Sequence, residues 1–199
     1  MKTIFRSLLL ASCALLGLGT ASATTVIPPT FDELVGQAEL IFQGTVTDVK
    51  SEWVGEGAER RIVSYVTFNV DEAIKGNAGA SYTIRMLGGT VGDRTMEVTD
   101  SPKFKVGDRD ILFVENNGKQ FIPLVGIMHG RYRVQQDKAT GDEVLLTNHG
   151  HALGDVKQLG KDDGHGHAHG AAAASGGAAA GIRPAEFKSL IRAKLANSR

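Results

Sequence analysis

Cysteine is nearly absent from this sequence, because Cys13 is the only one among 199 residues. It lies in an apolar run close to the first residue, so the remaining chain cannot form an internal disulfide. A domain without disulfides depends on the burial of apolar side chains for its stability. With 42% hydrophobic and 22% charged residues, the chain has the composition of an ordinary globular protein and can supply such a core.

Neither sign of charge is in excess, since the chain has 22 Lys and Arg residues and 22 Asp and Glu residues. Residues 1–23 contain Lys2, Arg6 and no acid, so the chain that follows them has 20 basic and 22 acidic residues. Proteins that bind nucleic acid through its phosphates carry a basic surface. We therefore expect no nucleic acid among the partners.

Long apolar runs are also missing, apart from one near the N-terminus. Lys2 and Arg6 come before an apolar run at 7–18, and Ala-Ser-Ala follows at 21–23. This order is typical of a secretory signal peptide, and the run is shorter than a membrane-spanning helix. We therefore expect residues 1–23 to be cleaved as a signal peptide. The protein is then periplasmic or secreted, with no transmembrane helix in the mature chain.

Residues 10–13, Leu-Ala-Ser-Cys, leave a second interpretation of this segment open. They resemble a bacterial lipobox, in which Cys13 would become a lipidated N-terminus. Because apolar residues continue past Cys13 to Leu18 and a better cleavage site follows, we favour a plain signal peptide.

The sequence contains no motif of a known catalytic centre. His129 could act as a general base, but a single His beside a strand is more often structural. A glycine pair at 88–89 lacks the following helix and the Lys-Ser/Thr of a phosphate loop. Four acids lie next to turns or at strand ends, where we expect them to be solvated: Asp93, Asp108, Asp110 and Glu115. We therefore expect a protein that is not an enzyme.

Alternating apolar and polar residues predict a mainly β fold. The clearest run is 62–74, where Ile62, Val66 and Phe68 share the parity of one buried strand face. The run before it keeps this alternation only if a β-bulge lies between Val46 and Val49. About eight such short runs, separated by turns, predict a small closed or partly open β-barrel of OB-like type. Residues 91–94 are expected to be a loop, and a turn at 116–118 predicts a hairpin that ends in a strand at 119–124.

Two helices are predicted, one near each end of the mature chain. Thr30 can cap a short N-terminal helix over 31–38, and Pro184 suits the first turn of an amphipathic C-terminal helix. Between the last predicted strand and the C-terminal helix lies a stretch rich in His, Gly and Ala. It has few large apolar residues, which predicts a disordered, flexible linker. The predicted domains are a β-barrel at 24–147, the linker at 148–181 and the C-terminal helix at 182–199.

The histidines of the linker are the only concentrated chemical signal. His165, His167 and His169 alternate with small residues near two acids. Imidazoles can bind zinc or copper, and flexible spacers let them converge on one ion. His149 and His151 could add ligands. A defined four-ligand spacing is missing, so a low-complexity linker that is merely rich in His stays as the other interpretation.

Several segments together resemble a group of exported bacterial proteins of unassigned function. They are residues 38–46 (AELIFQGTV), 70–76 (VDEAIKG), 87–89 (LGG), 102–108 (PKFKVGD) and 130–134 (GRYRV). This resemblance implies a fold for the chain but implies no activity.

More distantly, the first two predicted strands resemble the netrin-like module of tissue inhibitors of metalloproteinases, which is an OB-type barrel. Those inhibitors chelate the zinc of the protease through an N-terminal cysteine, whereas we expect the mature chain here to begin at Thr24. The chelating mechanism therefore does not carry over, although the rim of a barrel could still bind a protein.

From these observations we expect an exported, non-catalytic β-barrel domain that binds a protein or another component of the cell envelope. Loops around Trp53 and residues 88–94 form the expected contact surface. Trp53 is then an exposed anchor or, in the interpretation we favour, a rim residue that caps the core. Two alternatives remain open, namely a metal-binding or metal-delivery protein and a protease-inhibitor-like module.

Overall fold

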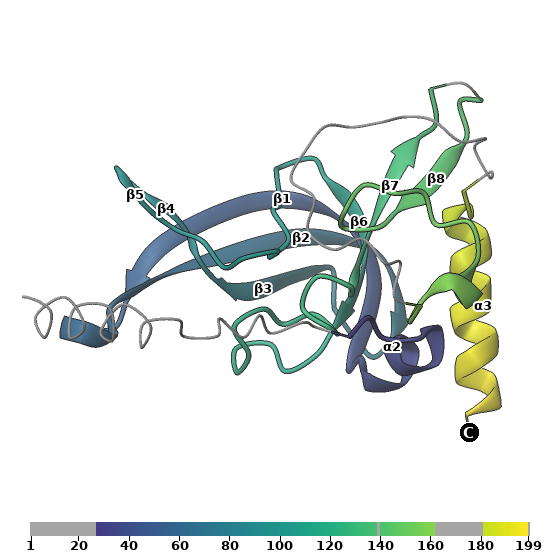
Figure 1. Cartoon of the computed structure of the whole chain (residues 1–199), viewed down its shortest axis with the longest axis horizontal. Helices are drawn as coiled ribbons and strands as arrows, with labels where there is room; N and C mark the ends of the chain where they lie inside the picture. Colours follow the sequence, from purple (N-terminus) through teal and green to yellow (C-terminus); the bar gives the residue numbers. More distant parts are fainter. Residues whose placement is uncertain (1–26, 139, 162–180, 199) are drawn as a thin grey trace, which may run out of the picture.

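The computed structural model describes residues 27–138, 140–161 and 181–198. This part of the chain is mainly β, with eight strands in two antiparallel sheets and one α-helix near each end. A six-stranded sheet forms the body, and two of its strands continue outward as a long curved arm (Figure 1). The prediction of a mainly β fold with a short N-terminal helix and a C-terminal helix is confirmed.

The six strands of the large sheet lie in the order β3-β2-β1-β6-β7-β8, and each neighbouring pair is antiparallel. Its edge strands, β3 and β8, do not pair with each other, so within the described residues the sheet is partly open. The strands are β1 Leu40–Val54, β2 Arg61–Lys75, β3 Ser81–Leu87, β6 Arg109–Val114, β7 Arg131–Gln136 and β8 Glu143–Leu146.

The arm is the hairpin of β1 and β2, which are each 15 residues long. Thr47 has no residue opposite it in the register of this hairpin, because Val46 faces Phe68 while Asp48 faces Thr67. The β-bulge predicted at this place is confirmed. Two further register shifts lie nearer the base of the hairpin. Because each bulge bends its strand and increases the local twist, the hairpin arches instead of running flat (Figure 1).

Helix α2 spans Phe31–Gln37 and α3 spans Pro184–Asn197, and both lie at the end of the molecule opposite the tip of the arm (Figure 1). Thr30 caps α2 as predicted, since its hydroxyl accepts the backbone N–H of Glu33 at 3.3 Å. The Glu33 carboxylate in turn accepts the backbone N–H of Thr30 at 2.8 Å, which completes a capping box.

Apolar side chains form a buried cluster on each face of the large sheet. Neighbouring residues of β1 and β6 alternate between the two, so Ile41 and Ile111 belong to the cluster under the helices, while Phe42 and Leu112 belong to the other. Phe187 of α3 is fully buried in the first cluster. The C-terminal helix is therefore packed onto the sheet.

Two short segments differ from the sequence-based prediction. A loop was expected at 91–94, but β4 Gly89–Val91 and β5 Arg94–Met96 form a separate two-stranded hairpin with its turn between them. A strand was expected at 119–124, but only Leu124 forms a bridge, to Val114. The contact with β6 is short and lies beyond its pairs with β7, where Glu115 donates its N–H to the Pro123 carbonyl at 3.2 Å and Val125 donates its N–H to the Phe113 carbonyl at 3.0 Å.

Residues 148–161 belong to the linker predicted from composition, yet they pack against the sheet. Leu153 is buried, and its N–H donates to the Leu145 carbonyl at 2.9 Å. Ile182 then donates its N–H to the Leu153 carbonyl at 2.7 Å, and its own carbonyl accepts the Leu145 N–H at 3.0 Å. The described part of the predicted linker therefore covers the outer edge of β8 together with Ile182.

Candidate functional site

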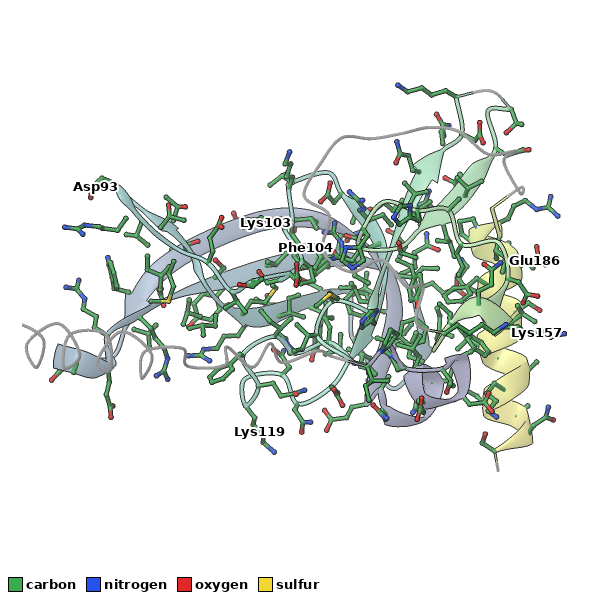
Figure 2. The ribbon with its side chains drawn as sticks, viewed as in Figure 1. Asp93, Lys103, Phe104, Lys119, Lys157 and Glu186 are labelled. Atoms are coloured by element: carbon green, nitrogen blue, oxygen red, sulfur yellow. The ribbon has the colours of Figure 1, made fainter. Side chains whose placement is uncertain are left out.

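A cavity of about 310 Å³ lies between the arm and the β4–β5 hairpin, and we call it the arm cavity. Its volume and its mostly apolar lining with a few polar groups are typical of ligand pockets. Figure 2 places Asp93 at the outer tip of the hairpin and Lys103 with Phe104 beside the middle of the arm. The lining side chains from the large sheet come from β1, β2 and β3, and they are Val49, Ser51, Ser64, Val66, Met86 and Leu87.

The β4–β5 hairpin crosses the arm at two glycines. Ser51 and Ser64 face each other across the arm with their hydroxyl oxygens 2.8 Å apart, and the Ser64 hydroxyl donates to the Gly88 carbonyl at 2.6 Å. Gly89 has a φ of +136°, and a Cβ on it would lie 2.2 Å from the Ser64 hydroxyl. Only glycine lets the hairpin backbone come this close. The glycine pair is therefore an attachment point of the hairpin.

Arg131 anchors the wall of the arm cavity from the core side. Its side chain is 2% exposed, and Nε and Nη2 donate to the two carboxylate oxygens of Asp110 at 2.9 and 3.1 Å. Nη2 also donates to Asp108 at 2.8 Å, and Nη1 donates to the Lys103 carbonyl at 2.6 Å. The Phe104 ring lies over the guanidinium, with its centroid 4.0 Å from the central carbon. One side chain thus holds the segment from Lys103 to Asp108 against the sheet.

Asp110 is fully buried, so the prediction that it is solvated is wrong. Burial raises the pKa of Asp110 to about 6, although the adjacent guanidinium of Arg131 acts in the opposite direction. Asp108 is partly exposed, as expected for a turn residue. The error arose because Asp110 stands at the start of a strand, and the arginine that pairs with it is 21 residues further along the chain.

Only some residues of the predicted contact surface line the arm cavity. Gly88, Gly89 and Thr90 line the cavity, as the prediction for residues 88–94 requires. Trp53 is half-buried further out on the arm, where the guanidinium carbon of Arg60 lies 4.6 Å from the centroid of its ring. In register Trp53 faces Ile62, so it lies on the same face of the arm as the Ser51–Ser64 pair. The tryptophan is therefore a neighbour of the cavity and not one of its lining residues.

His129, His149 and His151 lie together in a second cavity of about 400 Å³, which we call the histidine cavity. No sequence pattern groups His129 with the other two, because the loop after β8 brings the three together only in the fold. The described lining residues thus bring His129 into a cavity with two other imidazoles. The expectation that His129 is structural and not a general base stays a prediction.

The linker histidines His165, His167 and His169 lie outside the described residues, as do the predicted signal peptide and Cys13. Metal binding by these histidines and cleavage of residues 1–23 stay predictions. In the part of the chain that the structure describes, no three His, Cys, Asp or Glu side chains are arranged to hold a metal ion. No helix within this same part is long and apolar enough to span a membrane.

No family model, no curated protein and no solved structure matches this chain. The resemblance to exported bacterial proteins and to netrin-like modules therefore stays a prediction. Function has to be argued from the two cavities and from the segments that form them.

Proposed function

We propose that this chain is an exported, non-catalytic binding domain that holds part of a protein or other envelope partner in the arm cavity. The observation that carries the proposal is the cavity itself, which lies on an arm that extends away from the packed body of the molecule. A pocket in this position is accessible to a large partner, because the two helices and most of the core lie at the other end.

The lining of the arm cavity supports an apolar group as the bound part. Met86, Met96 and Phe104 present adaptable or aromatic surface to the cavity. The polar groups are mainly hydroxyls, and the two nearest the glycine crossing already bond each other and the hairpin. The two charged lining residues, Glu97 and Lys103, form an ion pair with each other, so an apolar side chain of a partner would not leave either charge without its counterion.

A single exposed substitution can block this cavity. Thr95 lies on β5, lines the cavity and shares a hydroxyl contact of 3.0 Å with Thr90. Thr83 on β3 makes the same kind of contact with Thr67, at 2.9 Å, but does not line the cavity. Thr95→Trp should therefore fill the cavity mouth, while Thr83→Trp is a matched control for the loss of a threonine pair.

The test is affinity capture from a cell-envelope extract with the wild-type chain and both variants, each first shown to be folded by circular dichroism. We expect a partner that is retained by the wild type and by Thr83→Trp and is lost with Thr95→Trp. Equal retention by all three proteins would place binding elsewhere. Recovery of no partner by the folded wild type would count against a binding domain altogether.

A further inference from the structure

The chain itself covers both outermost edges of the large sheet. The outer edge of β8 is covered by the segment around Leu153. The outer edge of β3 is covered by the loop after β6, because the Leu87 N–H donates to the Phe121 carbonyl at 2.7 Å. The Arg85 N–H on the same edge donates to the side-chain oxygen of Asn117 at 3.0 Å. A covered edge offers few free backbone groups to another chain.

The outer half of β1 has no such cover. Strand β6 pairs with β1 from Leu40 to Thr45, and the turn before β6 continues to Val46, whose carbonyl accepts the Gly107 N–H at 2.9 Å. Beyond Val46, the backbone of β1 pairs with β2 alone within the described residues, so residues 47–54 form an open edge along the arm (Figure 1). An open edge of this kind is a template for pairing with another strand.

The register of the arm identifies the backbone groups that point out of this open edge. Ile62 accepts the Gly88 N–H at 2.8 Å, so the backbone groups of Ile62 point toward β3 and away from β1. The residue opposite it on β1 points its own groups away from β2, since directly opposite residues in an antiparallel pair either bond each other or both point outward. The same holds for every second residue of this half of β1. The outward-pointing residues are Val49, Ser51 and Trp53.

The same three residues share the face of the arm that carries the arm cavity. Val49 and Ser51 line the cavity, and Trp53 lies beside them on that face. A residue of an added strand that lies directly opposite one of them has its side chain on the same face. A strand that pairs with the open edge would therefore direct every second side chain toward the arm cavity. The mostly apolar lining favours apolar residues at these positions.

The residues between them carry charges on the opposite face of the arm. They are Lys50 and Glu52. Opposite charges directly across two strands stabilise the pair, whereas like charges destabilise it. The open edge therefore favours an acid opposite Lys50 and a base opposite Glu52. Read from the N-terminus of an antiparallel partner strand, the favoured order is apolar, basic, apolar, acidic, apolar.

We infer that the open edge of β1 binds an extended segment of a partner protein as an additional antiparallel strand. Three pairs of residues supply about six backbone hydrogen bonds, and alternate side chains give specificity. The inference rests on the proposed function, because this strand brings the apolar side chains to the arm cavity. A single strand fits beside the β4–β5 hairpin better than a second copy of the chain does, since the hairpin of an antiparallel second copy would lie over the same face.

The experiment uses the acetylated and amidated peptide TVKVEVT as the probe and TVEVKVT as its control, both titrated calorimetrically into the full chain at pH 7. The two peptides have the same composition and net charge. We expect saturable binding of TVKVEVT and about fivefold or more weaker binding of TVEVKVT, which places like charges opposite Lys50 and Glu52. Equal affinities, or no saturable binding of TVKVEVT up to about 5 mM, would overturn the inference.

N-methylation of the peptide tests the backbone pairing directly. The valine N–H groups of TVKVEVT face β1 in this register, so methylating all three valine nitrogens should weaken binding at least about tenfold. Methylating the Lys and Glu nitrogens instead should leave the affinity unchanged, because those N–H groups point away from β1. Equal effects of the two modifications would refute strand addition.

A charge exchange on the protein locates the bound peptide. The double variant Lys50→Glu with Glu52→Lys should reverse the preference, so that TVEVKVT binds more tightly than TVKVEVT. Lys119→Glu, an exposed change in the loop after β6, should leave the preference as in the wild type. A preference unchanged in the double variant would place the peptide elsewhere. A dimer of the full chain that Lys50→Glu dissociates would replace the partner segment with a second copy.

The added strand and the proposed function can fail separately. Capture of a partner that is lost with Thr95→Trp, while neither peptide binds, would retain the binding domain and overturn the added strand. Binding of TVKVEVT that Thr95→Trp leaves unchanged would retain the strand and count against the arm cavity as the place of its side chains.

Discussion

Replacing Arg131 by methionine tests how much the buried ionic network contributes to stability. The variant keeps an unbranched side chain but removes four hydrogen bonds, two of them to Asp110 and one each to Asp108 and the Lys103 carbonyl. Asp110, which has no exposed surface, is then left without its cation. Breaking a buried ion pair from one side costs about 3–5 kcal/mol of unfolding free energy. Urea unfolding at pH 7 measures this loss.

The loss of unfolding free energy in Arg131→Met should also depend on pH. The pKa of Asp110 in the folded protein is about 6, above its ordinary value of 3.8. The stability that its protonation provides is therefore fully present below about pH 4 and is lost as the pH rises through about 6. Without Arg131 this pKa should rise further, by about 1 to 3. The loss caused by Arg131→Met should then be about 1–3 kcal/mol larger at pH 8 than at pH 5.

Arg109 provides the matched control on the neighbouring strand. Its side chain is 39% exposed and pairs with Asp71 and Glu143, so Arg109→Met should cost less than about 1 kcal/mol at both pH values. A loss below about 1 kcal/mol for Arg131→Met, or an equal loss at pH 5 and pH 8, would refute this account of the network. Faster hydrogen exchange of the amides at 103–108 in Arg131→Met would show that the cavity wall itself has loosened.

Four further predictions concern the arm, the helices and the linker. Gly89→Ala should destabilise the chain by about 1–3 kcal/mol in urea unfolding, because its Cβ meets two serine hydroxyls at a positive φ. Gly36→Ala, in open space within α2, should instead stabilise by about 0.5–1 kcal/mol, and a loss there would contradict the helix geometry. Phe187→Ala should cost about 3–5 kcal/mol by thermal unfolding, and a cost near zero would mean that α3 is not docked. Calorimetric titration with zinc and copper should show binding that disappears when three residues are replaced by alanine: His165, His167 and His169. Millimolar affinity, or affinity unchanged in that variant, would end the metal hypothesis.

The parts of the fold that sequence could predict are those determined by local pattern. Alternation along β2 predicted the buried face that includes Ile62, Val66 and Phe68, and all three are buried. The break in that alternation on β1 predicted the bulge at Thr47. Thr30 and the acids after it predicted the cap of α2, because a capping box needs only residues three apart. Each of these features depends on neighbours in the chain.

The features that were missed depend on contacts between distant segments. The burial of Asp110 requires Arg131, and their strands become neighbours only when the sheet forms. One signal was present in the sequence, because residues 111–114 are all apolar, which is typical of a strand buried on both faces. Asp110 directly precedes this run, and a charged residue at the start of such a strand needs a buried partner. The histidine cavity has no comparable signal, since its three segments have no shared pattern.

The start of β7 contributes to both cavities. Arg131 holds the wall of the arm cavity and also lines the histidine cavity, while the next residue, Tyr132, lines the histidine cavity and packs against Phe187 with ring centroids 5.0 Å apart. The two cavities therefore share Arg131, and Arg131→Met should alter both of them. Thr95→Trp should alter only the arm cavity, because Thr95 does not line the histidine cavity.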